Sequence, residues 1–189
     1  MAAGTVYLYA ADKAALLDLA IRAAAGLPLP AGDPPAQADL KATLADALGP
    51  RLALPRIRAV AAGDTGGAAV LRDILAELYD LLAREARLIL LLDRLGAEVP
   101  EIGAAYGTEL RARALRDFTR AIRQLAIRGG VRQDLDPGMA ARAVLEMIAW
   151  MAMRRSGGSE SPPGDEALAR ETTLRLAEAA LASDRRTSH

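Results

Sequence analysis

The sequence predicts an all-α protein on the strength of three observations. Hydrophobic residues make up 52% of the chain but aromatic residues only 3%, a balance that favours helices rich in Ala and Leu over sheets. Apolar residues recur at spacings of three and four, as they do along one face of a helix. Segments rich in Gly and Pro separate these stretches. With 189 residues, the chain is long enough to bury a core.

The first expected helix begins after Asp12, an N-cap residue, and runs to about Ala25. Gly26 ends it, because glycine readily adopts the conformation that terminates helices. The proline-rich segment 26–35 cannot continue a helix and therefore separates this element from the rest. Two shorter helices are expected next, at about 37–48 and 55–62.

The strongest helical pattern covers about 25 residues and predicts one long central helix, which Gly96 and Pro100 stop. Its apolar positions are Leu71, Leu75, Leu78, Leu82, Ala86, Ile89 and Leu92. A second long helix is expected over 102–128, with its own apolar stripe. We expect these two helices to pack side by side.

The last part of the chain contains two further expected helices. Gly129 and Gly130 terminate the preceding helix, and Asp136 caps the next one with Pro137 at its first position. That helix runs to about Arg155, and after a loop the final helix covers about 165–182.

Composition and the absence of catalytic motifs exclude several classes of protein. The formal net charge is zero, which argues against broad electrostatic attraction to nucleic acid or acidic membranes, and there is no cysteine. Apolar runs such as Leu88–Leu92 are far shorter than a membrane span, and no signal peptide is visible, so we expect a cytoplasmic protein. The only histidine is the terminal His189, and no metal-binding or phosphate-binding motif occurs. We therefore expect no enzyme, no cofactor and no metal; Glu77 and Asp80 are weak evidence for acid–base chemistry.

The first seventeen residues, MAAGTVYLYAADKAALL, carry a recognisable pattern. Gly4-Thr5-Val6-Tyr7-Leu8-Tyr9, followed by Asp12-Lys13 and Leu16-Leu17, resembles the end of the TetR-type DNA-binding domain. There a similar pattern closes the recognition helix of a helix-turn-helix and opens the next helix. Ala10 departs from the family, which usually has Phe at this position; if the site is buried, the smaller side chain weakens packing by ~3 kcal/mol.

The resemblance also implies that the first half of the helix-turn-helix is missing from this sequence. Residues 1–25 carry no net positive charge, whereas DNA affinity depends on neutralising phosphates, so the chain as written is expected to bind DNA poorly. Either the start codon is placed too far downstream or the chain is a fragment, and we favour the first explanation.

The segment IRGGVRQDLDPGMAARAVL resembles the same family independently, since its members often show a glycine-containing turn, an Arg-x-Asp-[LV]-Asp-Pro segment and an alanine-rich helix here. In the family, the last two helices pair with their copies in a second subunit as a four-helix interface. The resemblance thus implies a homodimer whose interface includes Ala140, Ala143, Met147, Met151, Leu174, Ala177 and Leu181. These residues could instead join the domain's own core, because periodicity does not distinguish the two.

Two further sets of residues follow from the resemblance. The positions expected to contact DNA are Thr5, Tyr7, Tyr9 and Lys13. The positions expected to line an effector pocket are Tyr79, Tyr106, Phe118, Met147 and Trp150. Few polar groups lie on these faces, so the effector, if there is one, is expected to be small and apolar or weakly polar. For the pocket residues the alternative is an ordinary core.

Two charged features have a plainer explanation than a binding site. Arg113, Arg116, Arg120 and Arg123 form a row that could bind an anion or a partner, but a solvated helix face explains it as well. Glu146 could recognise a ligand, yet Arg142 lies four residues earlier and can pair with it on the surface.

We therefore predict a TetR-like transcriptional regulator, a repressor whose operator binding responds to a small-molecule effector. Its expected parts are a partial helix-turn-helix domain at 1–25 and a helical effector-binding and dimerisation domain at 36–182. The alternative is a DNA-free sensing or dimerising module that pairs with a full-length relative. A helical-bundle enzyme is a remote third possibility.

Overall fold

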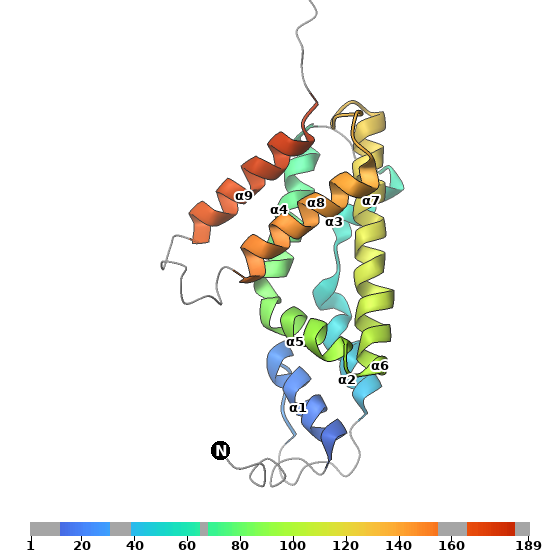
Figure 1. Ribbon diagram of the computed structural model, residues 1–189, viewed down its shortest axis with the longest axis vertical. Helices are drawn as coiled ribbons and strands as arrows, with labels where there is room; N and C mark the ends of the chain where they lie inside the picture. The colour runs from blue at the N-terminus through green and yellow to red at the C-terminus, as the bar shows by residue number, and fades with distance from the viewer. Residues whose placement is uncertain (1–11, 31–38, 65–67, 155–165, 184–189) are drawn as a thin grey trace, which may run out of the picture. The chain divides into compact units, whose positions relative to one another are not determined.

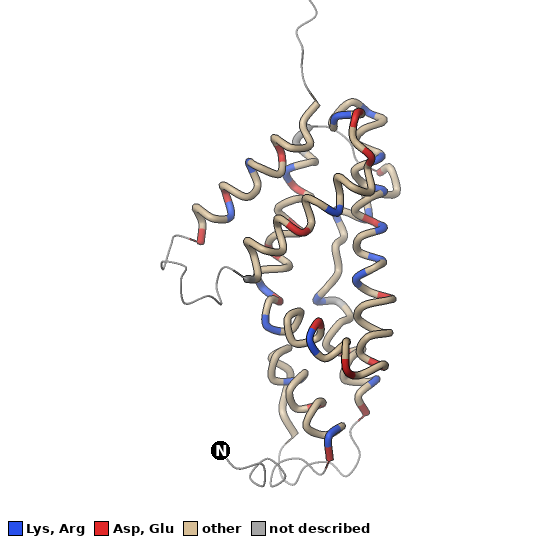
Figure 2. Tube along the Cα trace, viewed as in Figure 1, with Lys and Arg blue, Asp and Glu red and all other residues tan. Residues whose placement is uncertain are grey.

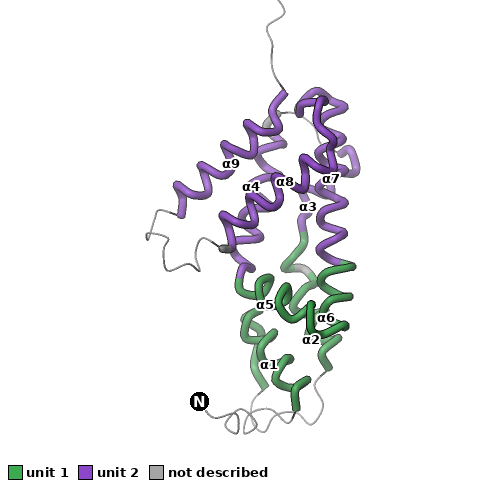
Figure 3. Tube along the Cα trace, viewed as in Figure 1, with its two compact units in different colours: residues 1–53, 87–109 green, residues 54–86, 110–189 purple. Residues whose placement is uncertain are grey.

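The computed structural model describes residues 12–30, 39–64, 68–154 and 166–183, and all regular secondary structure in these ranges is helical (Figure 1). The predicted all-α class is therefore confirmed. The chain forms two compact units: unit 1 comprises residues 1–53 and 87–109, and unit 2 comprises residues 54–86 and 110–189 (Figure 3). The predicted domain boundary between 25 and 36 falls within unit 1.

Unit 1 begins with two capped helices that pack on each other. In α1, Lys13–Ala25, the Asp12 carboxylate accepts from the backbone N–H of Ala15 at 2.8 Å, and Gly26 ends the helix with φ 61°. Both ends are as predicted. In α2, Leu40–Leu48, Asp39 caps the first turn in the same way, at 2.9 Å from Ala42 N.

A buried polar cluster joins α1 to α2. Asp18 is only 3% exposed and Thr43 is fully buried. The Arg22 side chain donates to Asp18 Oδ2 at 2.8 Å and to Thr43 Oγ1 at 3.0 Å, while the Thr43 hydroxyl donates to the other carboxylate oxygen of Asp18. Every polar group of the cluster has a partner, so burying the carboxylate carries no unsatisfied hydrogen bond.

The remaining elements of unit 1 either follow α2 directly or come from residues 87–109. They are the 3-10 turn η2, Pro50–Leu52, helix α5, Ala86–Gly96, the single turn α6, Pro100–Ile102, and the π-helical segment η3, Gly103–Arg111, as far as residue 109. The first residue of α5 is counted in unit 2.

Unit 2 consists of α3, Pro55–Ala62, α4, Ala68–Arg84, α7, Ala112–Ile127, α8, Pro137–Ala149, the π-helical segment η4, Trp150–Arg154, and α9, Glu166–Leu181. Helix α7 packs against α3 and α8, while α4 packs against α3, α8 and α9. Phe118 of α7, the only phenylalanine of the chain, is 1% exposed and lies in this core.

A cross-helix cap fixes the start of α3. Its N-cap residue, Leu54, has no side chain that can accept a hydrogen bond. Instead the carboxylate of Glu77 on α4 accepts from the backbone N–H groups of Arg56 at 3.0 Å and Ile57 at 2.9 Å. Helix N-termini favour negative charge, so this contact both caps α3 and attaches it to α4. It gives Glu77 a structural role.

The predicted long central helix is in fact two helices, because the chain turns at Glu85 between α4 and α5. The apolar positions Leu82, Ala86 and Ile89 keep their three- and four-residue spacing across the turn. Since that spacing is undisturbed, the periodicity could not reveal the interruption. The Glu85 side chain is 3% exposed and accepts from Arg84 Nε at 2.9 Å.

Two other predicted helices contain π-helical turns: the segment 102–128 comprises η3 and then α7, and α8 passes into η4. The apolar positions Tyr106, Leu110 and Ala114 keep a four-residue spacing through η3, so the sequence pattern did not distinguish this segment from an α-helix. The expectation that the segments 71–92 and 102–128 pack side by side is wrong for α4 and α7. The short helix α3 packs against both of them instead.

The capped start of α8 is confirmed. Asp136 Oδ1 accepts from Met139 N at 2.8 Å, and Pro137 occupies the first turn. Gly129, with φ 73°, follows α7 as the expected terminator. The final helix, α9, lies within one residue of its predicted bounds at each end.

We predict that Gly103→Ala destabilises the protein. A Cβ atom at Gly103 would lie 2.6 Å from the carbonyl oxygen of Gly96, where backbone must move to make room. Such overpacking costs about 1–3 kcal/mol of unfolding free energy, measurable by urea denaturation.

Gly107→Ala is the matched control, because it lies in the same π-helical segment and an added Cβ would have nothing within 4 Å. It should leave stability unchanged or raise it by up to ~1 kcal/mol. Equal losses in both variants would contradict the close approach of Gly96 and Gly103.

Candidate functional site

A cleft of about 440 Å³ in unit 2 is the candidate functional site. It lies among α4, η4 and α9, and its volume falls within the range of small-molecule pockets. The lining residues are Tyr79, Asp80, Ala83, Arg84, Met151, Ala152, Glu166, Ala167 and Arg170. Small and apolar side chains alternate with four charged ones, so the cleft offers both contact surface and polar partners.

Helical spacing brings the lining residues together. On α4, Tyr79 and Ala83 are four residues apart, and so are Asp80 and Arg84, so each pair lies on one side of the helix. On α9, Glu166 and Arg170 have the same relation. The third wall is the π-helical segment η4 with Met151 and Ala152. π-helical turns occur frequently at functional sites, which is a second reason to single out this cleft.

The central polar contact of the cleft is a two-pronged ion pair between α9 and α4. Arg170 Nε donates to Asp80 Oδ1 at 2.6 Å, and Arg170 Nη2 donates to Asp80 Oδ2 at 2.7 Å. This parallel geometry is the strong form of an arginine–carboxylate contact. The hydrogen bond to Asp80 raises the pKa of Arg170, so its guanidinium stays charged.

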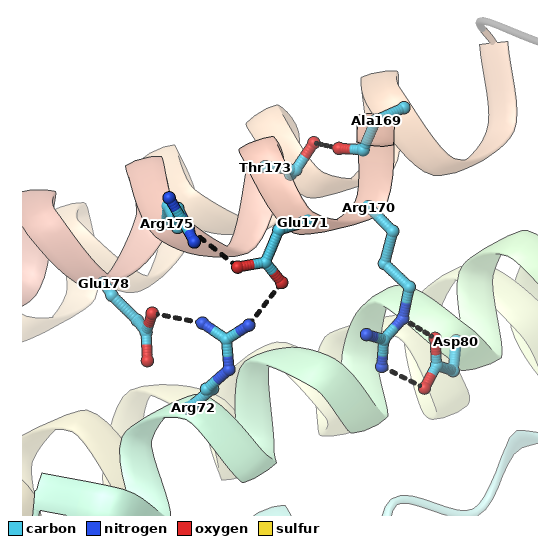
Figure 4. Close-up of polar contacts among 8 residues, drawn as sticks. All are labelled: Arg72, Asp80, Ala169, Arg170, Glu171, Thr173, Arg175 and Glu178. Carbon is cyan, nitrogen blue, oxygen red and sulfur yellow. Dashed lines mark hydrogen bonds and ion pairs between the residues drawn. The ribbon is translucent and has the colours of Figure 1, made fainter. Parts of the chain in front are cut away.

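A second group of ion pairs attaches α9 to α4 further along the helices (Figure 4). Arg72 of α4 donates to Glu178 at 2.7 Å and to Glu171 at 2.5 Å. Arg175 donates to the other oxygen of Glu171 at 2.7 Å, so this carboxylate is shared by two guanidinium groups. The hydrogen bond from Arg175, followed by that from Arg72, lowers the pKa of Glu171.

The structure brings only some of the predicted pocket residues to the cleft. Tyr79 lines it, and so does Met151, which was predicted for the dimer interface. Tyr106 is buried in unit 1, and Phe118 is buried in unit 2 as part of the core. Met147 is half-buried on α8, and Trp150 is 61% exposed. Neither lines the cleft.

Of the positions expected to contact DNA, Thr5, Tyr7 and Tyr9 lie outside the described residues. Lys13 is the first residue of α1 and is exposed.

The residues predicted for the dimer interface fall into two groups. Leu174, Ala177 and Leu181 are buried within the single chain, each at most 1% exposed, and therefore fasten α9 to its own unit. Ala140 is 9% exposed, whereas Ala143 is exposed. The burial of the first group is what the alternative explanation, a domain core, requires. Because these three side chains are buried, a different surface of α9 is left for contact with a partner.

That other surface exposes large apolar side chains. On α9, Leu168 and Leu176 are 64% and 57% exposed, and Thr172 between them is exposed too. Met139 of α8 is 71% exposed, and Trp150, the first residue of η4, is 61% exposed. Together with Ala143 and Met147 of α8, these residues recur every three or four positions, so they form one stripe. Large exposed apolar groups on two adjoining helices are typical of a protein interface.

Several charged residues considered above form contacts in the structure. The Arg142–Glu146 pair is confirmed at 2.9 Å on the surface of α8, and Asp80 is engaged by Arg170. Sequence reasoning missed Arg84, Glu166 and Arg170 as cleft residues, because Arg170 and Asp80 are 90 residues apart. In the sequence, the only pattern that marked these cleft residues was the four-residue spacing between charged positions within α4 and α9.

Among the described residues, no group of acidic or histidine side chains is arranged to hold a metal ion. None of the described helices combines the length and apolarity needed to cross a bilayer. No protein-family model, curated protein or solved structure matches this chain, so its likeness to the TetR family rests on the sequence motifs alone.

We predict that the contribution of Glu171 to stability disappears in acid. Its pKa is lowered from an ordinary value of 4.5, so its ion pairs stabilise the folded state above that pH and are lost as pH falls through the lowered value. Glu171→Gln should therefore lower Tm near neutral pH and low salt, but not at a pH below the folded pKa. Thermal unfolding followed by circular dichroism over a pH series measures this.

Glu98→Gln serves as the control, because Glu98 is exposed and forms no ion pair with any described residue. Its Tm should follow that of the unaltered protein at every pH. A Glu171→Gln effect that persists unchanged in acid, or that equals the control, would contradict the role given to these ion pairs.

Proposed function

We propose that this protein is a dimeric, TetR-like transcriptional repressor whose operator binding is controlled by a small-molecule effector. The DNA-reading part of the proposal rests on the motif from Gly4 to Lys13, which in the family closes the recognition helix and opens the next one. The motif agrees with the start of α1, which Asp12 caps just before Lys13, and this agreement supports the proposal.

The observation that carries the proposal is the exposed apolar surface of α8 and α9. Met139, Trp150, Leu168 and Leu176 are each more than half exposed, on α8 with its continuation η4 and on α9, the region that the family uses for dimerisation. Tryptophan and methionine are enriched in the buried centres of protein interfaces. The partner we propose is a second copy of the chain, because a two-fold dimer covers the same surface on both copies.

The effector site that we propose is the cleft among α4, η4 and α9. Tyr79, Ala83 and Met151 would contact the apolar body of an effector, and Asp80 and Arg170 would meet any polar group. The same helix, α9, lines the cleft and carries Leu168 and Leu176. An effector that favours one position of α9 would therefore alter the dimer, which is the kind of coupling that moves two DNA-reading helices.

The proposal is tested by mapping the DNA that the protein occupies in its native cell. Immunoprecipitation of cross-linked chromatin should enrich a few genomic sites that share a palindrome with half-sites one helical turn apart. Replacing Thr5 and Tyr7 by Ala should abolish the enrichment, because these side chains are proposed to contact the DNA. Lys41→Ala, a change of one exposed cation elsewhere, should leave it intact.

Absence of any enriched site would contradict the proposal. If the chain then co-purified with a longer relative, the DNA-free dimerising module would replace it. Enrichment that survives the Thr5 and Tyr7 changes would show that the motif does not read the operator.

A further inference from the structure

One face of unit 2 carries a local excess of positive charge that the proposed function does not use. It is formed by α3 and α7, which pack on each other, and its charged residues are Arg58, Arg113, Arg116, Asp117, Arg120 and Arg123. We call it the arginine face. Asp117 is the only carboxylate on either helix, so five arginines stand against one acid although the whole chain is neutral. Figure 2 shows the basic positions recurring along α7.

The arginines of α7 lie on one side of the helix. Positions 113, 116, 120 and 123 fall within an arc of about 80°, and they span about 15 Å along the axis. All four are exposed, while Phe118, Ala121 and Leu125 on the other side are buried. The row is therefore accessible along one side of α7, while the opposite side of the helix packs in the core of unit 2.

One carboxylate, that of Asp117, lies near three of the five guanidinium groups. Asp117 lies 3.8 Å from Arg58, 3.9 Å from Arg113 and 4.0 Å from Arg120, and its side chain is 17% exposed. These are long contacts, so none of the three arginines is held by a close ion pair with Asp117.

The other two arginines, Arg116 and Arg123, form no ion pair with any residue that the structure describes. Most of the positive charge of the face thus remains available to an outside partner.

We propose that the arginine face binds the phosphate backbone of double-stranded nucleic acid without reading its sequence. Guanidinium groups pair with phosphates through two parallel hydrogen bonds, and an evenly spaced row suits a polymer with evenly spaced charges. The face has no exposed aromatic side chain on which unpaired bases could stack, since Phe118 is buried, so a duplex fits better than a single strand. The apolar side of α7 is buried in the unit and cannot enter a membrane.

This binding is separate from operator recognition, which the proposed function assigns to residues 4–17. The face would add a salt-dependent affinity to any duplex that lies along unit 2, in a chain whose zero net charge gives no general attraction.

The test is the salt dependence of binding to a short duplex of mixed sequence that contains no palindrome. Fluorescence anisotropy between about 50 and 200 mM salt should give a plot of log K against log salt with a slope of about −3 to −4, as expected for four or so phosphates neutralised. Replacing Arg116, Arg120 and Arg123 by Ala should reduce the size of this slope by about 2–3. Alanine is the best helix former, so α7 should remain folded in this variant, as circular dichroism would verify.

The matched control removes three exposed cations elsewhere, by the changes Lys41→Ala, Arg87→Ala and Arg94→Ala. It alters net charge equally and should leave the slope unchanged. A second variant with Lys at positions 116, 120 and 123 keeps the charges and should keep the slope.

Three outcomes would overturn the proposal: no binding at the lowest salt, equal slopes for the alanine variant and the unaltered protein, or equal losses in the alanine variant and the control. Tighter binding of polyglutamate than of the duplex, lost in the same alanine variant, would assign the face to acidic proteins instead.

Discussion

The attachment of α9 to α4 is the interaction on which the candidate site and the candidate interface both depend. Arg170 with Asp80, and Arg72 with Glu171 and Glu178, join the two helices from the outside, while Leu174 and Ala177 are buried between elements of unit 2. One side of α9 thus closes the cleft, and another presents Leu168 and Leu176. Moving α9 would change both surfaces together.

The two kinds of contact have different consequences. Burial of apolar side chains such as Leu174 supplies the larger part of the attachment, whereas exposed ion pairs add little stability one by one but fix orientation. Arg170 and Asp80 lie in the cleft, so a ligand with a charged group would compete with their contact directly. The apolar contacts would hold α9 in the unit while its polar contacts are exchanged. This arrangement would allow an adjustment of α9 without loss of the fold.

The sequence predicted the all-α fold and most helix ends, because caps are local: Asp12, Gly26 and Asp136 act within four residues of themselves. It did not predict the turn at Glu85 or the π-helical segments, since apolar spacing continues through them. Among the residues that line the cleft, the sequence predicted only Tyr79 as a pocket residue. Arg170 and Asp80 were missed because their contact is created by the packing of α9 on α4.

The most direct test of this account is whether the chain dimerises through the exposed side of α9. Sedimentation equilibrium should find the unaltered protein as a dimer and Leu176→Glu as a monomer, because the change places a charge in an apolar interface. Ile127→Glu is the control: Ile127 is 69% exposed at the end of α7, and its variant should remain dimeric. A monomeric unaltered protein, or equal dissociation of both variants, would contradict the account.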